Sequence, residues 1–290
     1  MSSSKAKRVK ASGSRKPPLT AKVINQLRKA SMAKVVSIQA ARDAKVWADG
    51  LDASIIKKEQ MEQLDPLHAA YCFAQNKMSA LVEQLAELPA LIKLNNCYAD
   101  AQDEYMPQGP PISPLTLSYF TCWAFFDLNV GNHEETFGYV TTEVCRELQA
   151  DSGLISLFEA MNTSRMGLYI HEGLSVDFVF LRELVTGKRH KARVPSGHKG
   201  YQGEMWLARI LPPPVQESGF DYSIVFTTPY VIGKTTGKLF KRFNAMGDEQ
   251  GWEAYFDRTL SQIRAEDRAQ AYQKLMKYGL SRNYWNEYIM

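Results

Sequence analysis

Apolar side chains recur at helical spacing through most of the first 165 residues. After Asp65-Pro66 the spacing alternates between four and three residues over three heptads, which keeps one face of a helix apolar. The apolar positions of this face are Leu67, Tyr71, Ala74, Met78, Leu81, Leu85 and Leu88. Asp caps free amides, Pro suits a first turn, and Pro89 ends or bends the helix. We predict a core helix of a bundle here, with a short intermolecular coiled coil as the alternative.

Four further helices are predicted in this half. Between Thr20 and about Trp47, apolar residues share one face and basic residues occupy most of the rest. The run LTLSYFTCWAFFDLNV, which follows Ser113-Pro114, is apolar nearly all round, as in a central buried helix. Asn132 is expected to cap the next helix, and Asp151 or Ser152 the one after it.

The pattern changes near Met166. Short runs rich in aromatic and β-branched residues follow, and turn residues separate them. Tyr222, Ile224 and Phe226 alternate with polar positions, as in a half-buried strand. We predict four or five antiparallel strands up to about residue 232. Helical spacing returns after Gly237, at about 238–246, 251–264, 267–278 and 281–288.

These elements predict an α+β fold with an N-terminal helical half, a small antiparallel β-sheet or partial barrel, and a C-terminal helical cap. The expected divisions are a disordered basic arm (1–18), a helical domain (19–165), a small antiparallel β module (166–236) and C-terminal helices (237–290). Aromatic residues near the C-terminus favour packing of those helices on the body. A chain of 290 residues with 45% hydrophobic content buries a sizeable core.

Composition narrows the class of protein. No apolar run reaches the roughly 18 residues that indicate a membrane span. The first residues lack the apolar region of a secretory signal; a transit peptide stays open, although Lys rather than Arg dominates. The four cysteines stand about 25 residues apart without C-x-x-C spacing, which favours buried reduced thiols in a cytoplasmic protein. They are Cys72, Cys97, Cys122 and Cys145.

Charge is divided unevenly along the chain. No acidic residue precedes Asp43, and the first 50 residues hold twelve basic and two acidic side chains. The other 240 residues hold the remaining 23 basic and 29 acidic ones. A basic arm on a slightly acidic body is typical of proteins that contact polyanions, above all nucleic acid.

A second basic cluster occupies a stretch of twelve residues inside the predicted β module, on and around a hairpin. It consists of Lys188, Arg189, His190, Lys191, Arg193, His198 and Lys199, and the aromatic residues Tyr201 and Trp206 follow. Cations on a β platform with a neighbouring aromatic ring suit a phosphate backbone and a stacked base. The alternative is a solvated edge, because Lys and Arg commonly protect exposed strands from aggregation.

No pattern of catalytic residues stands out. The segment GKTTGK (233–238) lacks the first glycine of a phosphate-binding loop, so a turn at the end of a strand is the better interpretation. His133-Glu134-Glu135 and His171-Glu172 offer metal-ligand types without H-E-x-x-H spacing. No G-x-S-x-G motif is present. We therefore predict no catalytic residue, cofactor or metal site, and lean against an enzyme.

One stretch resembles a known group of sequences. LRELVTGKRHKARVPSGHKGYQGEMWLARILP (181–212) is similar to a β module of uncharacterised bacterial proteins that sometimes accompanies the SEC-C type of zinc ribbon. The likeness rests on Leu181, Arg182, Leu184, Thr186, Gly187, Gly203, Leu207, Ala208, Arg209, Leu211 and Pro212. It implies a small barrel-like module and a bacterial source. The cysteine cluster of the ribbon is absent, so zinc binding is not implied.

The leading functional hypothesis is a non-catalytic protein that binds nucleic acid or a ribonucleoprotein through phosphate contacts. The expected contact residues are Lys5, Lys7, Arg8, Lys10, Arg15 and Lys16 in the arm, and Lys188, Arg189, Lys191, Arg193 and Lys199 in the basic hairpin. One alternative is a protein-interaction subunit that uses the 67–88 face or the C-terminal helices. A less favoured one is a metal-assisted hydrolase that uses His133 and His171. No membrane partner is expected.

Overall fold

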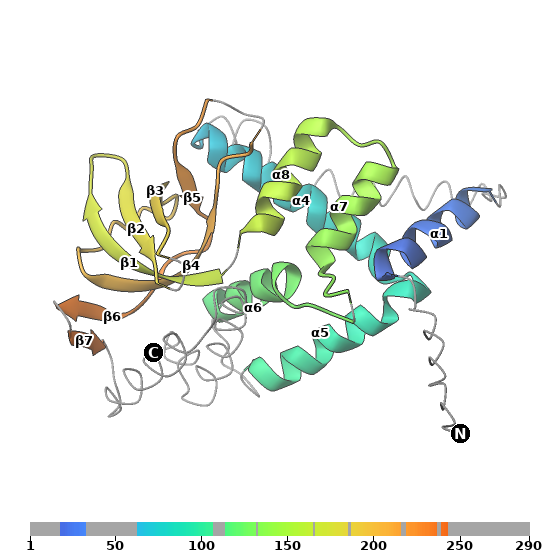
Figure 1. Cartoon of the computed structure of the whole chain (residues 1–290), viewed down its shortest axis with the longest axis horizontal. Coiled ribbons are helices and arrows are strands. Elements are labelled where there is room, and N and C mark those ends of the chain that lie inside the picture. The colour runs from blue at the N-terminus through green and yellow to red at the C-terminus, as the bar shows by residue number, and fades with distance from the viewer. Residues whose placement is uncertain are drawn as a thin grey trace, which may run out of the picture.

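The computed structural model describes residues 18–32, 63–106, 114–131, 133–164, 166–184, 187–215, 219–236 and 239–242. Within these ranges a helical body stands beside a β-barrel along the long axis of the molecule (Figure 1). The mixed α+β class is thereby confirmed. The chain builds the helices first and the strands second, because the apolar period changes from helical to strand-like near Met166.

The body contains six α-helices and one short 3₁₀ helix among the described residues. They are α1 (Leu19–Met32), α4 (Pro66–Ala86), η1 (Pro89–Leu91), α5 (Ile92–Tyr105), α6 (Pro114–Phe126), α7 (Phe137–Glu147) and α8 (Ser152–Thr163). The strands are β1 (Met166–Leu174), β2 (Val179–Glu183), β3 (Arg189–Arg193), β4 (Glu204–Leu211), β5 (Ser223–Val225), β6 (Tyr230–Thr236) and β7 (Leu239–Arg242).

Helix α4 confirms the strongest local prediction. An oxygen of Asp65 accepts hydrogen bonds from the N–H groups of Leu67 and His68, both at 3.1 Å, and Pro66 starts the helix. The apolar face is buried within the same chain, where it contacts α7, α8 and the end of β4. That face is therefore occupied, and the alternative of an intermolecular coiled coil is wrong.

Two further cap predictions have different outcomes. Asp151 caps α8 as expected and accepts the N–H of Leu154 at 3.0 Å. For α7, Asn132 lies outside the described residues, and the capping residue is Thr136, whose hydroxyl accepts the N–H of Tyr139 at 3.1 Å. Both Thr and Asn favour this position, so sequence alone did not separate them.

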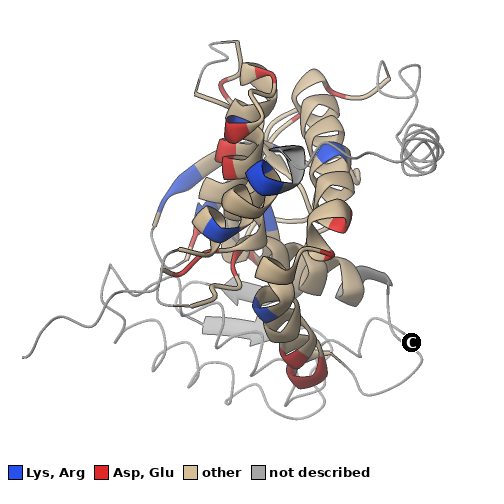
Figure 2. Ribbon diagram, turned by 90° about the vertical axis from the view of Figure 1, so that its right-hand side faces the viewer, with Lys and Arg blue, Asp and Glu red and all other residues tan. Residues whose placement is uncertain are grey.

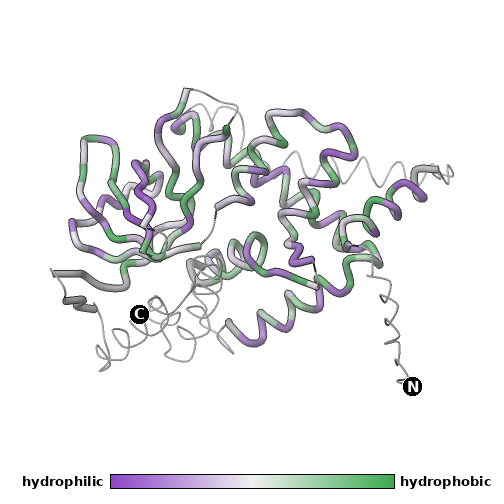
Figure 3. Tube along the Cα trace, in the orientation of Figure 1, coloured by the Kyte–Doolittle hydropathy of each residue, from purple (hydrophilic) through white to green (hydrophobic). Residues whose placement is uncertain are grey.

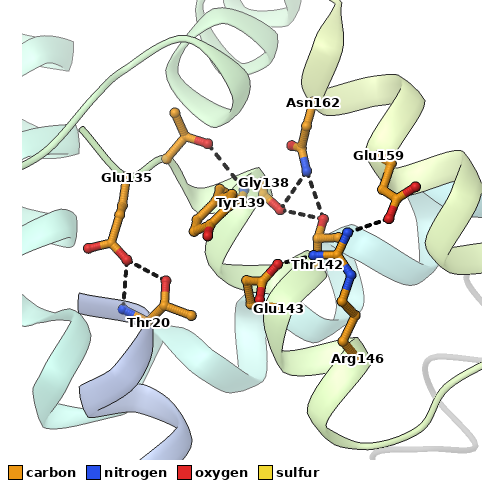
Figure 4. A network of polar contacts seen from close by, with 10 residues as sticks. Thr20, Glu135, Gly138, Tyr139, Thr142, Glu143, Arg146, Glu159 and Asn162 are labelled. Carbon is orange, nitrogen blue, oxygen red and sulfur yellow. Dashed lines mark hydrogen bonds and ion pairs between the residues drawn. The ribbon is translucent and has the colours of Figure 1, made fainter. Parts of the chain in front are cut away.

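Helix α1 is held against the body at its N-terminus (Figure 4). The buried carboxylate of Glu135 accepts the N–H groups of Leu19 and Thr20, the latter at 3.0 Å, and the Thr20 hydroxyl. A carboxylate at this end also meets the positive pole of the helix dipole. Near the other end, Arg28 forms a two-pronged ion pair with Glu147 of α7, with N–O distances of 2.7 and 2.8 Å.

A second polar contact joins α7 to α8. The side-chain amide of Asn162 donates to the Thr142 hydroxyl at 2.7 Å and to the carbonyl of Gly138 at 3.2 Å (Figure 4). The two helices approach closely there: a Cβ added at Gly138 would lie 2.3 Å from the Asn162 oxygen. Glycine is therefore required at this crossing, since any side chain would displace Asn162.

Five strands close into a barrel in the order β1-β2-β3-β5-β4, and β4 pairs back onto β1. Strands β6 and β7 extend the sheet beyond β4. The first half of β1 pairs with β4 and the second half with β2, with a bulge between His171 and Gly173. One pair, β3 with β5, is parallel. The predicted partial barrel is thus closed and not wholly antiparallel.

Strand β7 also corrects the expected helix at 238–246. Its four residues, 239–242, pair with β6 as an antiparallel strand, while residues 238 and 243–246 lie outside the described residues. The expected helices further along the chain lie outside the described residues.

Strand β4 is buried on both faces. Trp206, Ala208 and Ile210 fill the barrel interior, whereas Leu211 faces the helical core together with Ile224 of β5. Hydrophobic and hydrophilic residues alternate along much of the barrel (Figure 3). The outer side of β4 is therefore the surface through which barrel and helices join.

Arg209 lies at the centre of this junction and is completely buried. Its guanidinium forms an ion pair with Asp127, at the end of α6, and donates to the Ser164 hydroxyl at 2.9 Å. Its charge lies over the ring of Phe126, 5.0 Å from the centroid. Burial lowers the pKa of Arg209, and the neighbouring Cys122 of α6 acts in the opposite direction.

The part of the chain that the structure describes contains no helix long and apolar enough to cross a membrane. All four cysteines are free thiols, and Cys145 is buried.

Replacing Arg209 with Met should lower the free energy of unfolding by about 3–5 kcal/mol, because it leaves the Asp127 carboxylate without its buried partner. Urea unfolding followed by tryptophan fluorescence measures the loss. The matched control is Arg28→Met, which breaks an exposed ion pair and should change stability little. Equal losses in the two variants would contradict the assigned role of Arg209.

Candidate nucleic-acid interface

The predicted hairpin cations lie mainly on the outer face of β2 and β3. Alternation along the strands directs Val179, Leu181, His190 and Ala192 toward the barrel interior. It leaves Phe180 and Arg182 of β2, and Arg189, Lys191 and Arg193 of β3, on the outside. Across the strands, Phe180 is paired with Lys191, and Arg182 with Arg189. We define the outer β2–β3 face as these four residues together with Arg193 at the end of β3.

Glu172 of β1 holds two of these cations. One carboxylate oxygen accepts from Arg182 at 2.8 Å and the other from Arg189 at 2.9 Å. The hydrogen bond from Arg189 lowers the pKa of Glu172, and that from Arg182 acts in the same direction. Arg189 is 76% exposed even in this pair, so its outer surface remains open to solvent.

The carboxylate partner of Lys191 is more exposed than that of Arg182 and Arg189. The Lys191 ammonium lies 2.7 Å from Asp221, whose side chain is 79% exposed, and 4.4 Å above the centre of the Phe178 ring. The Lys191 hydrogen bond lowers the pKa of Asp221. Exposed ion pairs of this kind contribute little to stability, so an incoming phosphate can replace the carboxylate.

Arg193 has a structural role. It donates to Asp65 at 2.8 Å, and the Asp65 side chain is only 9% exposed. The Tyr222 hydroxyl donates to the same oxygen at 2.8 Å, and burial together with Asp65 raises the pKa of Tyr222 to about 12. Asp65 thus caps α4 with one oxygen and anchors the barrel with the other, which keeps Arg193 in place.

Aromatic rings line the same end of the face. Phe178 and Tyr222 lie 5.2 Å apart, and Phe220 meets Tyr222 edge-on at 5.7 Å. Phe180, beside Lys191, is 40% exposed. Sequence reasoning missed these rings, because they lie on strand β2 and in the loops before it and before β5, outside the basic run. Of the two aromatics expected to stack on a base, Trp206 is completely buried and Tyr201 is exposed.

The loop between β3 and β4 closes one end of the barrel. A ring nitrogen of His171, inside the barrel, lies 3.0 Å from the carbonyl of Lys199, and the His198 ring packs on Trp206. The Lys199 ammonium donates to the carbonyl of Val176 at 3.2 Å. Lys199 therefore stands beside the outer β2–β3 face and bonds to the loop between β1 and β2.

The face as a whole is balanced in charge. Its cations Arg182, Arg189, Lys191 and Arg193 contact the carboxylates Glu172, Asp221, Asp65 and Asp177. Lys188 precedes β3 and also has an interaction partner. At the helical end of the molecule, basic and acidic residues are interspersed (Figure 2). The basic run of the sequence is therefore not a bare positive patch.

The arm residues Lys5, Lys7, Arg8, Lys10, Arg15 and Lys16 lie outside the described residues. The arm precedes α1, which packs on α7 and η1 at the opposite end of the molecule from the barrel (Figure 1). Seventeen extended residues span at most about 60 Å, so only an extended arm reaches from α1 toward the barrel. Of a third basic group along the sequence, Lys241 and Arg242 belong to strand β7, and Lys238 lies outside the described residues.

No group of three or more His, Cys, Asp or Glu in the described ranges is placed to hold a metal ion. His171 lies inside the barrel and Glu172 outside it, while His133 is on an exposed turn before α7. The segment from Gly233 continues strand β6 up to Thr236 and forms no phosphate-binding loop there.

Comparisons of the chain with models of protein families, with curated proteins and with solved structures find no match.

Acid should destabilise the barrel through His190. Burial, and secondarily Lys188, lower the pKa of His190 to about 4. The unfolded chain, with an ordinary histidine pKa near 6.5, therefore binds the proton first. His190 stabilises the fold fully above about pH 6.5, and this contribution is lost as pH falls toward 4. Urea midpoints should fall less steeply over that range in His190→Gln than in the wild type; equal slopes would contradict the assignment.

Proposed function

We propose that this protein is a non-catalytic binding protein that takes up a single strand of nucleic acid on the outer β2–β3 face. The observation that carries the proposal is the position of Lys191: its ammonium lies above the Phe178 ring, and its backbone is paired across the strands with the exposed Phe180. Rings that accept bases beside cations that accept phosphates are the common features of single-strand binding surfaces.

The barrel architecture supports the same surface. Its strand order, with β1 shared between two halves and β3 parallel to β5, is that of OB-type barrels. Barrels of that type bind oligonucleotides or oligosaccharides on strands 2 and 3 and on the loops between strands 1 and 2 and strands 4 and 5. Here those loops supply Phe178, Phe220 and Tyr222. This likeness concerns the architecture alone, so it supports the choice of binding surface but does not identify the ligand.

Ion pairing divides the proposed contacts into two groups. Lys191 and Arg189 are exchangeable, because their carboxylate partners are bound in solvent-exposed pairs. Arg193 is fixed by the buried Asp65 and shapes the surface instead of binding phosphate. The arm, with six cations before Pro17, supplies the sequence-independent attraction that a charge-balanced face lacks.

Two substitutions should change the affinity in opposite directions. Lys191→Ala removes a phosphate contact, weakens binding, and reduces the slope of log affinity against log salt by about 0.7. Asp221→Asn removes the competing carboxylate and should tighten binding. Fluorescence anisotropy with a labelled oligonucleotide of about 20 nucleotides, longer than the site of one barrel, measures both.

The matched control is Arg146→Ala, which removes an exposed ion-paired cation from α7 and should leave affinity unchanged. If Lys191→Ala and Asp221→Asn shift the affinity in the same direction, or if neither shifts it, the outer β2–β3 face is not the binding surface.

Deletion of residues 2–16 should weaken binding to every sequence alike. It removes six cations, so the salt slope should fall by up to about 4 units if all of them contact phosphate. The same anisotropy titrations, repeated at several salt concentrations, measure the slope. An unchanged slope would show that the arm contributes nothing to binding.

A further inference from the structure

A cavity of about 460 Å³ opens between α4, α6 and the chain that follows β5. Its apolar walls are Met78 of α4, Leu117, Phe125 and Phe126 of α6, and Phe226. Hydroxyl, amide and thiol groups complete it, and none of the described residues that line it is charged. The cavity is distinct from the outer β2–β3 face.

Part of this apolar surface is uncovered in the described chain. Leu117 is 47% exposed and Phe125 is only partly buried, although α6 is the most apolar helix of the body. The size and the mixture of apolar walls with a few neutral polar groups are those of a binding site. An uncharged lining selects an apolar occupant, because a charged group would lose its hydration without gaining a partner.

The chain itself contains an occupant of the right chemistry. Between residues 251 and 264 the large apolar side chains are Trp252, Tyr255, Phe256, Leu260 and Ile263. At 100° per residue these positions fall within an arc of about 140° on a helix, and the charged residues Asp257 and Arg258 lie outside that arc. Anchors at spacings of three and four residues are typical of helices that bind in apolar grooves.

The end of the described chain lies within reach of the cavity. Arg242 pairs with Gly233 across the β6–β7 hairpin, and Gly233 is six residues from Thr227, which lines the cavity. Six extended residues and one inter-strand step put Arg242 at most about 27 Å from Thr227. The ten residues from Arg242 to Trp252 span up to about 35 Å. The first anchor can therefore enter the cavity.

We propose that residues 251–264 dock as an amphipathic helix into the cavity between α4 and α6 of the same chain. The short connection gives the segment a high effective concentration at the site, so modest intrinsic affinity suffices. Docking would cover Leu117, Phe125 and the thiol of Cys122, which lines the cavity. It would also fasten the C-terminal segment beside Phe126, on which the buried guanidinium of Arg209 lies.

The reactivity of Cys122 tests the proposal in the full chain. Labelling with N-ethylmaleimide, quantified for each cysteine by mass spectrometry, should be slow in the wild type. In Trp252→Ser/Phe256→Ser, labelling of Cys122 should accelerate by at least about tenfold, the change produced by 1.4 kcal/mol of lost docking free energy. Cys97 on α5 serves as the internal reference, and Asp257→Ser/Arg258→Ser, on the polar face, should match the wild type. Equal rates for Cys122 in the wild type and the anchor variant would overturn the proposal.

A photo-crosslink gives an answer even if the anchor variant folds poorly. With p-benzoylphenylalanine in place of Leu117 in an otherwise unchanged chain, irradiation should join position 117 to residues 251–264 of the same molecule. Crosslinks to other segments, or between two copies of the chain, would refute docking in cis. So would uptake of the uncharged dye Nile red by the wild type to the same extent as by Trp252→Ser/Phe256→Ser, because the cavity would then be an open small-molecule site. None of these results depends on nucleic-acid binding.

Discussion

The buried contact of Arg209 with Asp127 determines how the two halves of this molecule fit together. A guanidinium without water needs acceptors, and Asp127 and Ser164 from the helical body both accept hydrogen bonds from it. This contact fixes the outer side of β4 against the helices. It thereby brings the start of α4 to the end of β3, where Asp65 binds both Arg193 and Tyr222. The shape of the candidate interface is thus a consequence of the junction.

Electrostatics at the interface can be understood only in three dimensions. Sequence identifies the cations near residue 190, but their partners come from α4, from β1 and from the loop before β5. In the folded chain each cation of the outer β2–β3 face contacts a carboxylate, so the charges of the face are largely balanced. Its exchangeable members, Arg189 and Lys191, differ from the fixed Arg193 by the exposure of their partners rather than by their residue type. A neutral face with rings would select a strand by stacking, while the arm would supply long-range attraction.

The sequence predicted correctly those features that depend on interactions between residues close together in the chain. The apolar period of α4 and the caps Asp65 and Asp151 depend on residues a few positions apart, and the structure confirms all three. Closure of the barrel depends on pairing between β1 and β4 and between β3 and β5, which no short window contains. Strand β4 lost its alternation because both faces are buried, and β7 is too short for its period to separate strand from helix. The carboxylates that pair with the cations of the outer β2–β3 face were not predicted either, because they are far from those cations in the sequence.

The central claim is that bases stack on the rings of the outer β2–β3 face and its flanking loops. Ultraviolet crosslinking of the full chain to a uniformly pyrimidine single strand, with the joined residues mapped by mass spectrometry, tests it most directly. The account predicts crosslinks at Phe178, Phe180 or Tyr222 that disappear with excess unlabelled strand. Crosslinks confined to the arm, or to the helical body away from these rings, would contradict it.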